Sequence, residues 1–251
     1  MNVRERMKGE LERRVTALGS ELTKWEAVAS SNIDGFGIHK RQIQAVRVMI
    51  GDLDVKQRTK VGALDPATTK DFAEKYLECV EEMAALHDVW EIFQQALQQR
   101  GDAAMQRRLD AADLIAADCY RQCIDTAVSW GALQNDEKRP PPLVVIEPST
   151  SAATVGRGEE IGMLGHPLRR YRELTLTVPL VLLPADHLDS MWLLCAIFHE
   201  VGHSLDQDLG LEAELKGRVN DLIDAKKVTD GSMWWEWTSE VLADAVGVLY
   251  G

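Results

Sequence analysis

Apolar residues recur at every third or fourth position through about the first 130 residues, which is the spacing of one buried helical face. An Asp-Pro pair, a common helix start, stands at Asp65 and Pro66. The expected helices are an opening one with its stripe from Met7 to Val28, a second over about 38–53, a third from the Asp-Pro pair to Leu97, and a fourth from Met105 to Val128. This half of the chain predicts a helical bundle.

The pattern changes at the segment NDEKRPPP, which is too polar and too rich in proline to continue a helix. We therefore expect a helical bundle domain over 1–134, a linker over 135–142, and a second domain over 143–251.

The second domain has two short apolar segments typical of strands, 143–146 and 174–183. Pro179 lacks a backbone donor, so the second of these is expected at a sheet edge. The glycine-rich stretch 154–166 between them predicts a loop or hairpin. Three helices are expected to follow, over about 186–209, 211–226 and 233–250. The fold class predicted is α+β, mostly α, with a small sheet.

Composition and charge limit the classes of binding partner and the cellular location that we expect. A formal net charge of −12 disfavours nucleic acid and anionic membranes, and tolerates basic peptides better. The first residues are charged and have no apolar segment, and the four cysteines lack the spacing of a disulfide scaffold, so a cytoplasmic location is expected. Cys119 and Cys123 lie one helical turn apart; two buried small side chains are the more typical explanation, and a shared metal is the alternative.

The segment FHEVGHS contains the residues most suited to metal binding and catalysis. His199 and His203 are four residues apart, which places them about 40° apart on one helical face and lets both imidazoles reach one ion. Glu200 projects beside them and can accept a proton from a metal-activated water.

A catalytic zinc needs a third protein ligand and an open position. The segment EVLAD supplies a candidate, because Glu240 and Asp244 are again four residues apart on a predicted helix. Glu240 can bind the ion while Asp244 accepts a hydrogen bond from a ligating histidine. Glu236, one turn earlier, is the nearest substitute ligand.

HEVGH followed by EVLAD resembles the pattern of the gluzincins, the zinc peptidases that include the thermolysin-like enzymes. The resemblance covers about the last third of the chain. It implies one zinc held by His199, His203 and Glu240, with Glu200 as general base and Asp244 orienting His199. It also implies a zincin-like second domain, in which the strand before the metal helix, here 174–183, is an edge strand that pairs with an extended peptide.

The histidine or tyrosine that stabilises the oxyanion in thermolysin-like enzymes follows the third ligand, and here only Tyr250 follows it closely. A continuous helix places Tyr250 about 15 Å beyond Glu240, too far to reach the metal. The upstream candidates for this contact are His166, Tyr171, His187 and the basic run 169–172, for which a solvated turn is the commoner explanation. One or two of the three tryptophans in the segment MWWEW are expected to wall the site or join the core, with a docking surface as the alternative.

The function predicted is hydrolysis of peptide bonds by a zinc-activated water, with a peptide or protein as substrate. The main alternative is an inactive interaction protein that keeps a structural or vestigial metal site and binds a partner through its N-terminal helices. A third possibility makes these helices a lid over the edge strand. A di-iron bundle would need a second Glu-x-x-His segment, and the other histidines do not supply one.

Overall fold

The computed structural model describes residues 2–31, 36–68, 71–134, 139–158, 175–226 and 232–251. Within these ranges the chain forms two compact units. The first contains the residues up to Gln98 together with 175–177, and the second contains 99–158 and 178–251. Each unit is described by itself.

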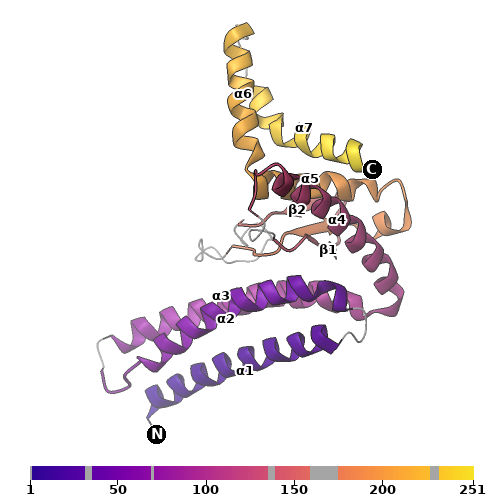
Figure 1. Cartoon of the computed structure of the whole chain (residues 1–251). Coiled ribbons are helices and arrows are strands. Elements are labelled where there is room, and N and C mark those ends of the chain that lie inside the picture. Colours follow the sequence, from indigo (N-terminus) through magenta and orange to yellow (C-terminus); the bar gives the residue numbers. More distant parts are fainter. Residues whose placement is uncertain (1, 32–35, 69–70, 135–138, 159–174, 227–231) are drawn as a thin grey trace. The chain divides into compact units, whose positions relative to one another are not determined.

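Three long helices make up the first unit: α1 (Val3–Ser31), α2 (Lys40–Gly62) and α3 (Phe72–Gln98), with a short 3-10 helix, η1 (Phe36–His39), before α2. They lie side by side, and each contacts the other two (Figure 1). Trp25 of α1 meets Trp90 of α3 edge to face, with ring centroids 6.2 Å apart. The helical spacing of apolar residues therefore located all three helices.

The start of α3 differs from the prediction. Asp65 does not cap this helix; its carboxylate accepts hydrogen bonds from the Ala67 amide and the Thr68 hydroxyl, which closes a turn before the helix. The polar side chain of Asp65 thus satisfies local donors ahead of α3, which begins at Phe72.

Helices and a small sheet build the second unit (Figure 1). In chain order the elements are η2 (Gln99–Gly101), α4 (Ala103–Ser129), β1 (Leu143–Ile146), β2 (Ala153–Val155), β3 (Leu180–Leu183), η5 (Ala185–Asp189), α5 (Cys195–Leu209), α6 (Leu211–Lys226) and α7 (Ser232–Tyr250). The α+β, mostly α fold class is confirmed. Among the helices of the described residues, none combines the length and the apolar run that crossing a bilayer requires.

The predicted helix over 186–209 is shorter than expected. The chain first forms η5, after which Ser190 is extended, with φ −126° and ψ 115°, so a continuous helix is interrupted there. The regular helix α5 begins only at Cys195 and ends at Leu209. The next residue, Gly210, caps it with a φ of 66°, the left-handed conformation that favours glycine.

The three strands pair in the order β1-β3-β2, with β1 parallel and β2 antiparallel to β3. The prediction of an edge strand over 174–183 is therefore wrong for its described part, because β3 is the central strand. Pro179 lies just before the ladder, where its carbonyl accepts a hydrogen bond from the Leu143 amide at 2.9 Å, so its missing N–H interrupts no pair. Among the described strands, β2 is the antiparallel edge strand.

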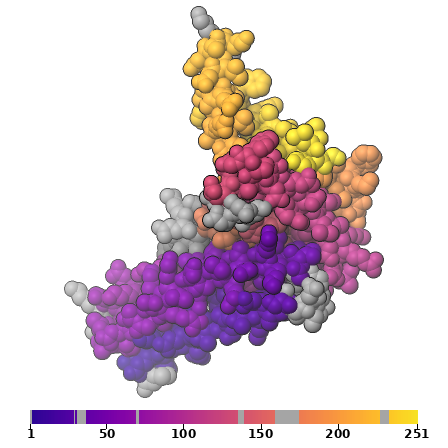
Figure 2. Space-filling view, in the orientation of Figure 1, coloured from indigo at the N-terminus to yellow at the C-terminus, as the bar shows by residue number. Residues whose placement is uncertain are grey.

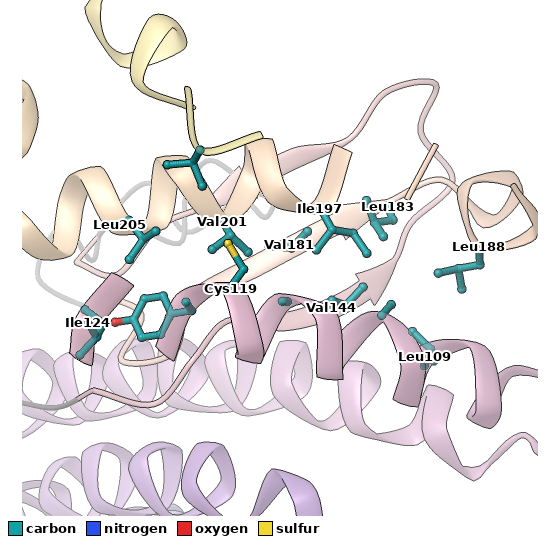
Figure 3. Close-up of a cluster of buried hydrophobic side chains, with 14 residues drawn as sticks. Leu109, Cys119, Ile124, Val144, Val181, Leu183, Leu188, Ile197, Val201 and Leu205 are labelled. Carbon is teal, nitrogen blue, oxygen red and sulfur yellow. The ribbon is translucent and has the colours of Figure 1, made fainter. Parts of the chain in front are cut away.

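One hydrophobic core joins α4, α5 and the sheet (Figure 3). Leu109 and Cys119 of α4 face Ile197, Val201 and Leu205 of α5, and the strands contribute side chains between them. The helix α4 was expected in the N-terminal bundle, but it packs against β1 and α5. The two units consequently divide near residue 98 and not at the predicted linker over 135–142.

The outer edge of β1 is closed by side chains from η2 and α4. Arg100 donates to the carbonyl of Val144 at 2.6 Å, Asp113 accepts from the Val144 amide at 2.9 Å, and Arg100 and Asp113 form a buried ion pair. Burial raises the pKa of Asp113 to about 6, and the Arg100 charge opposes that shift. Gln99 satisfies the amide and carbonyl of Ile146 in the same way, so β1 offers no free backbone groups at these two residues.

Replacing Arg100 with leucine should destabilise the second unit, since it leaves the Asp113 carboxylate buried without its counter-charge. We expect a loss of about 3–5 kcal/mol in the free energy of unfolding, measured by urea denaturation. Arg107→Ala, at an exposed position of α4, the helix that carries Asp113, is the control and should change the free energy of unfolding by less than about 0.5 kcal/mol. Equal effects of both variants would contradict this role for the ion pair.

Candidate functional site

The candidate site forms where α5 and α7 cross at close range. A Cβ atom on Gly202 would lie 2.7 Å from the Cα of Ala243, a separation that real side chains do not tolerate. Ala243 is completely buried in this contact, and Gly247 of α7 lies against the backbone of His199. Small residues on both helices therefore let α7 approach α5 closely enough for its carboxylates to reach the histidines.

Three ligand atoms converge at this crossing. The Nε2 atoms of His199 and His203 are 3.2 Å apart. The Glu240 carboxylate contributes Oε2 at 3.4 Å from His199 Nε2 and Oε1 at 3.7 Å from His203 Nε2. The structure thus brings together the three residues that the sequence nominated as metal ligands.

The other ring nitrogen of each histidine also has a partner. His199 Nδ1 lies 2.9 Å from Oδ1 of Asp244, the residue expected to orient it. His203 Nδ1 lies 3.2 Å from the hydroxyl of Ser239, whose Oγ donates to Asp206 Oδ2 at 2.9 Å. A carboxylate accepts hydrogen bonds only, and the serine proton is committed to Asp206, so both rings carry their hydrogen on Nδ1. In the neutral form of each ring, Nε2 then carries a lone pair that can bind a metal.

The spacing of the ligand atoms suits a small divalent ion. Zinc binds imidazole nitrogen and carboxylate oxygen at about 2.0–2.1 Å in a tetrahedral arrangement, which separates neighbouring ligand atoms by about 3.3 Å. The three separations here, 3.2, 3.4 and 3.7 Å, lie close to that value. Two nitrogens and one carboxylate are also a ligand set that zinc accepts in catalytic sites.

Glu200 lies beside the ligands, and Thr154 of β2 holds it. The Thr154 hydroxyl is 2.7 Å from Glu200 Oε2 and 2.8 Å from the carbonyl oxygen of Glu200. The residue is 6% exposed, so its carboxylate is shielded from bulk water apart from the cavity that it lines. The edge strand β2 thereby fixes the orientation of the expected general base.

A cavity of about 450 Å³ opens over these groups. Its lining comes from β2 and the residue before it, from α5, from the start of α6 and from α7. The lining residues are Ala152, Ala153, Thr154, His199, Glu200, His203, Asp206, Gln207, Glu212, Ser239 and Glu240. The cavity therefore runs along an edge strand and reaches the candidate ligands and Glu200.

The candidates for an oxyanion contact are not brought to this cavity. His187 lies in η5 and is absent from the described lining. His166, Tyr171 and the basic run 169–172 fall outside the described residues. Tyr250, expected to be out of reach, has its hydroxyl 3.3 Å from the Cys123 sulfur and does not line the cavity in the described part of the chain.

The tryptophans at the start of α7 are exposed, which contradicts the expectation that they join the core. Trp234, Trp235 and Trp237 keep 59%, 44% and 58% of their surface accessible. None of them lines the described cavity, and Glu236 lies outside the ligand cluster. The yellow part of the surface in Figure 2 marks α7. Trp235 packs against α6, where Lys216 lies over its ring and Asn220 accepts its indole hydrogen at 2.7 Å.

Cys119 and Cys123 face the core rather than a ligand set. Cys119 is 2% exposed, and its hydrogen bond with the Cys123 thiol, together with burial, raises its pKa. The hydrogen bond from Cys119 lowers the pKa of Cys123 to about 6. Within the described residues, the group with the donors of a metal site is the one at His199, His203 and Glu240.

Sequence reasoning missed three residues of this site: Thr154, Asp206 and Ser239. Thr154 gave no local signal, because its place depends on the pairing of β2 with β3. Asp206 and Ser239 stand near the motifs, three residues after His203 and one before Glu240, so their proximity in sequence was a usable hint.

The comparisons with known proteins identify no relative: no family model, no curated protein and no solved structure matches this chain. The resemblance to gluzincins therefore rests on the two short motifs and stays a hypothesis.

Adding a methyl group at Gly202 should disturb the site. We expect Gly202→Ala to push α7 away from α5 and to lower the free energy of unfolding by about 1–3 kcal/mol, as measured by urea denaturation. Gly217→Ala on α6, where an added Cβ meets no atom within 4 Å, is the matched control and should stabilise by about 0.5–1 kcal/mol. A Gly202 variant as stable as the control would show that the close crossing is not required.

Proposed function

We propose that this protein is a zinc-dependent hydrolase of peptide bonds, with one zinc bound by His199, His203 and Glu240. The observation that carries the proposal is the convergence of two bare imidazole nitrogens and a carboxylate on one point. Three electron-pair donors repel one another at these distances unless a cation lies among them. Their spacing and chemistry match zinc.

In such a site zinc supplies Lewis-acid polarisation of a carbonyl and lowers the pKa of a water molecule. Asp244 and Ser239 keep the two imidazoles in the ligating tautomer. Glu200 is the general base: its carboxylate accepts the proton of the attacking water and passes it to the departing amine. Thr154 holds that carboxylate toward the cavity while the proton moves.

The substrate class follows from the sheet edge. A peptide in extended conformation can pair with an exposed antiparallel edge strand, and β2 lies beside Glu200. The opposite edge, β1, has the backbone of Val144 and Ile146 bonded to side chains. We therefore assign peptide pairing to β2 and no longer to the segment 174–183.

Charge in the cavity favours substrates without acidic groups. Glu200, Asp206, Glu212 and Glu240 all line it, and no lysine or arginine does so among the residues described. Lys216 pairs with Glu212 from outside this lining and offsets part of that charge. Neutral or basic peptides are the expected substrates.

One observation favours the alternative of an inactive interaction protein. The described lining of the cavity contains no tyrosine, no arginine and no histidine besides the two ligands, which are the usual donors to an oxyanion. In that case the metal would hold α5 and α7 together, and the N-terminal helices would bind a partner. Cytoplasmic location also stays a prediction.

Zinc content and turnover test the proposal together. Elemental mass spectrometry of chelator-free protein should find one zinc per chain in the wild type and none in His199→Ala or Glu240→Ala. Glu200→Gln should keep its zinc, because Glu200 is not a ligand, and should lose at least about 100-fold in kcat on a basic fluorogenic peptide library.

Each result separates the two functions. Zinc without any turnover in the wild type would support the interaction protein, and equal turnover in the wild type and Glu200→Gln would reject the assigned base. A wild type that takes up no zinc, even after equilibration with it, would contradict both the zinc hydrolase and the interaction protein with a structural metal. Glu236→Gln, at an exposed acidic position one turn from Glu240, is the matched control and should keep both zinc and activity.

A further inference from the structure

Asp206 is a buried carboxylate at the junction of three helices. It belongs to α5, is 3% exposed, and has a partner at each oxygen. Oδ1 accepts the amide of Glu212 in the first turn of α6 at 2.6 Å, and Oδ2 accepts the hydroxyl of Ser239 in α7 at 2.9 Å. One side chain thus connects the helix of the histidines with the two helices that follow it.

The two partners of the Ser239 hydroxyl determine where its hydrogen points. Because Asp206 only accepts, the single serine proton points to Oδ2, and the serine oxygen offers a lone pair to the nearby ring nitrogen. His203 must therefore donate its Nδ1 hydrogen to Ser239, at 3.2 Å, and keep Nε2 free. Removing the serine hydroxyl would leave the His203 ring without a partner at Nδ1 and able to turn or change tautomer.

We propose that Asp206 and Ser239 are positioning residues: Asp206, acting through Ser239, fixes the ring and tautomer of His203 for ligation. This inference rests on the proposed zinc site. It adds two cavity-lining residues that act through His203 and need not touch the metal or the substrate. The Asp206 carboxylate is then the group that determines the orientation of the His203 ring.

The two histidines are held in different surroundings. Asp244, the partner of His199, has 73% of its side chain exposed, so water competes for that hydrogen bond. Asp206 is buried, so its bond to Ser239 is shielded from such competition. The hydrogen bonds from Asp206 through Ser239 therefore hold His203 more rigidly than Asp244 holds His199. They also act next to Glu240, because Ser239 is the residue before that ligand.

The second bond of Asp206 sets a wall of the cavity. The carboxylate lies at the start of α6, where unpaired amides and the helix dipole favour a negative charge. By binding the Glu212 amide it fixes where α6 begins, and Glu212 lines the cavity. The Asp206 carboxylate thus determines both the orientation of the His203 ring and the position of the cavity wall at Glu212.

The test compares the zinc affinity of four proteins by competition with a chromophoric chelator: the wild type, Ser239→Ala, Ser239→Thr and Thr238→Val. We expect Ser239→Ala to bind zinc about 10–100-fold more weakly, and Ser239→Thr, which keeps the hydroxyl, to stay within about threefold of the wild type. Thr238→Val is the matched control. Its hydroxyl is the neighbouring one on α7 and bonds the carbonyl of Trp234, away from the ligands, so its loss should leave zinc affinity unchanged.

A second measurement tests, independently of zinc, whether Asp206 and Ser239 fix the tautomer of His203. Nitrogen-15 NMR of the metal-free protein should show His203 with its hydrogen on Nδ1 in the wild type, and a mixture of tautomers in Ser239→Ala and in Asp206→Ala. Equal zinc affinity in wild type and Ser239→Ala, or the same tautomer mixture in all three proteins, would overturn the proposal. A wild type that binds no zinc would overturn the proposed function instead, while the NMR result would still show whether Asp206 and Ser239 order the ring.

Discussion

The close crossing of α5 and α7 is the constraint on which the rest of the second unit depends. Two helices normally keep about 8–10 Å between their axes, and the side chains at the contact set that distance. Gly202 and Ala243 present almost no side chain, so the helices meet nearly backbone to backbone. The glycine lies inside the histidine motif, and the alanine lies inside the glutamate motif. The residues between the functional positions therefore determine whether those positions can meet.

Hydrogen bonds engage the polar groups that surround the candidate ligand atoms at the crossing. Each imidazole has its donor engaged, the Glu200 carboxylate is engaged by Thr154, and one edge of the sheet is engaged by Gln99, Arg100 and Asp113. Among the described residues, the Nε2 atoms of His199 and His203 and the Glu240 carboxylate converge on one point, and β2 lies beside Glu200. An electron-rich point beside a backbone edge is the arrangement that the proposed hydrolysis of extended peptides would use.

Periodic patterns and local spacing predicted the parts of the molecule that depend on sequence neighbours. The helices followed from apolar residues spaced three and four apart, and the proximity of His199, His203 and Glu240 followed from pairs four residues apart on two helices. Strand order did not follow, because Pro179 carries no information about which strands flank β3. The place of α4 with the sheet, the exposure of Trp234 and the contact of Thr154 with Glu200 are likewise decided by tertiary packing between distant segments.

The helix that carries Glu240 is covered on one side only. Its buried residues include Ala243 and Val246, whereas Trp237, Val241 and Val248 face outward, and the adjoining α6 has no buried residue. The buried apolar side chains that α7 contributes, Ala243 and Val246, are small, so we expect this helix to open locally at a lower free energy than global unfolding. An ion bound across the two helices would act as a cross-link against that opening. Occupancy of the site and the lifetime of the closed helix pair would then rise and fall together.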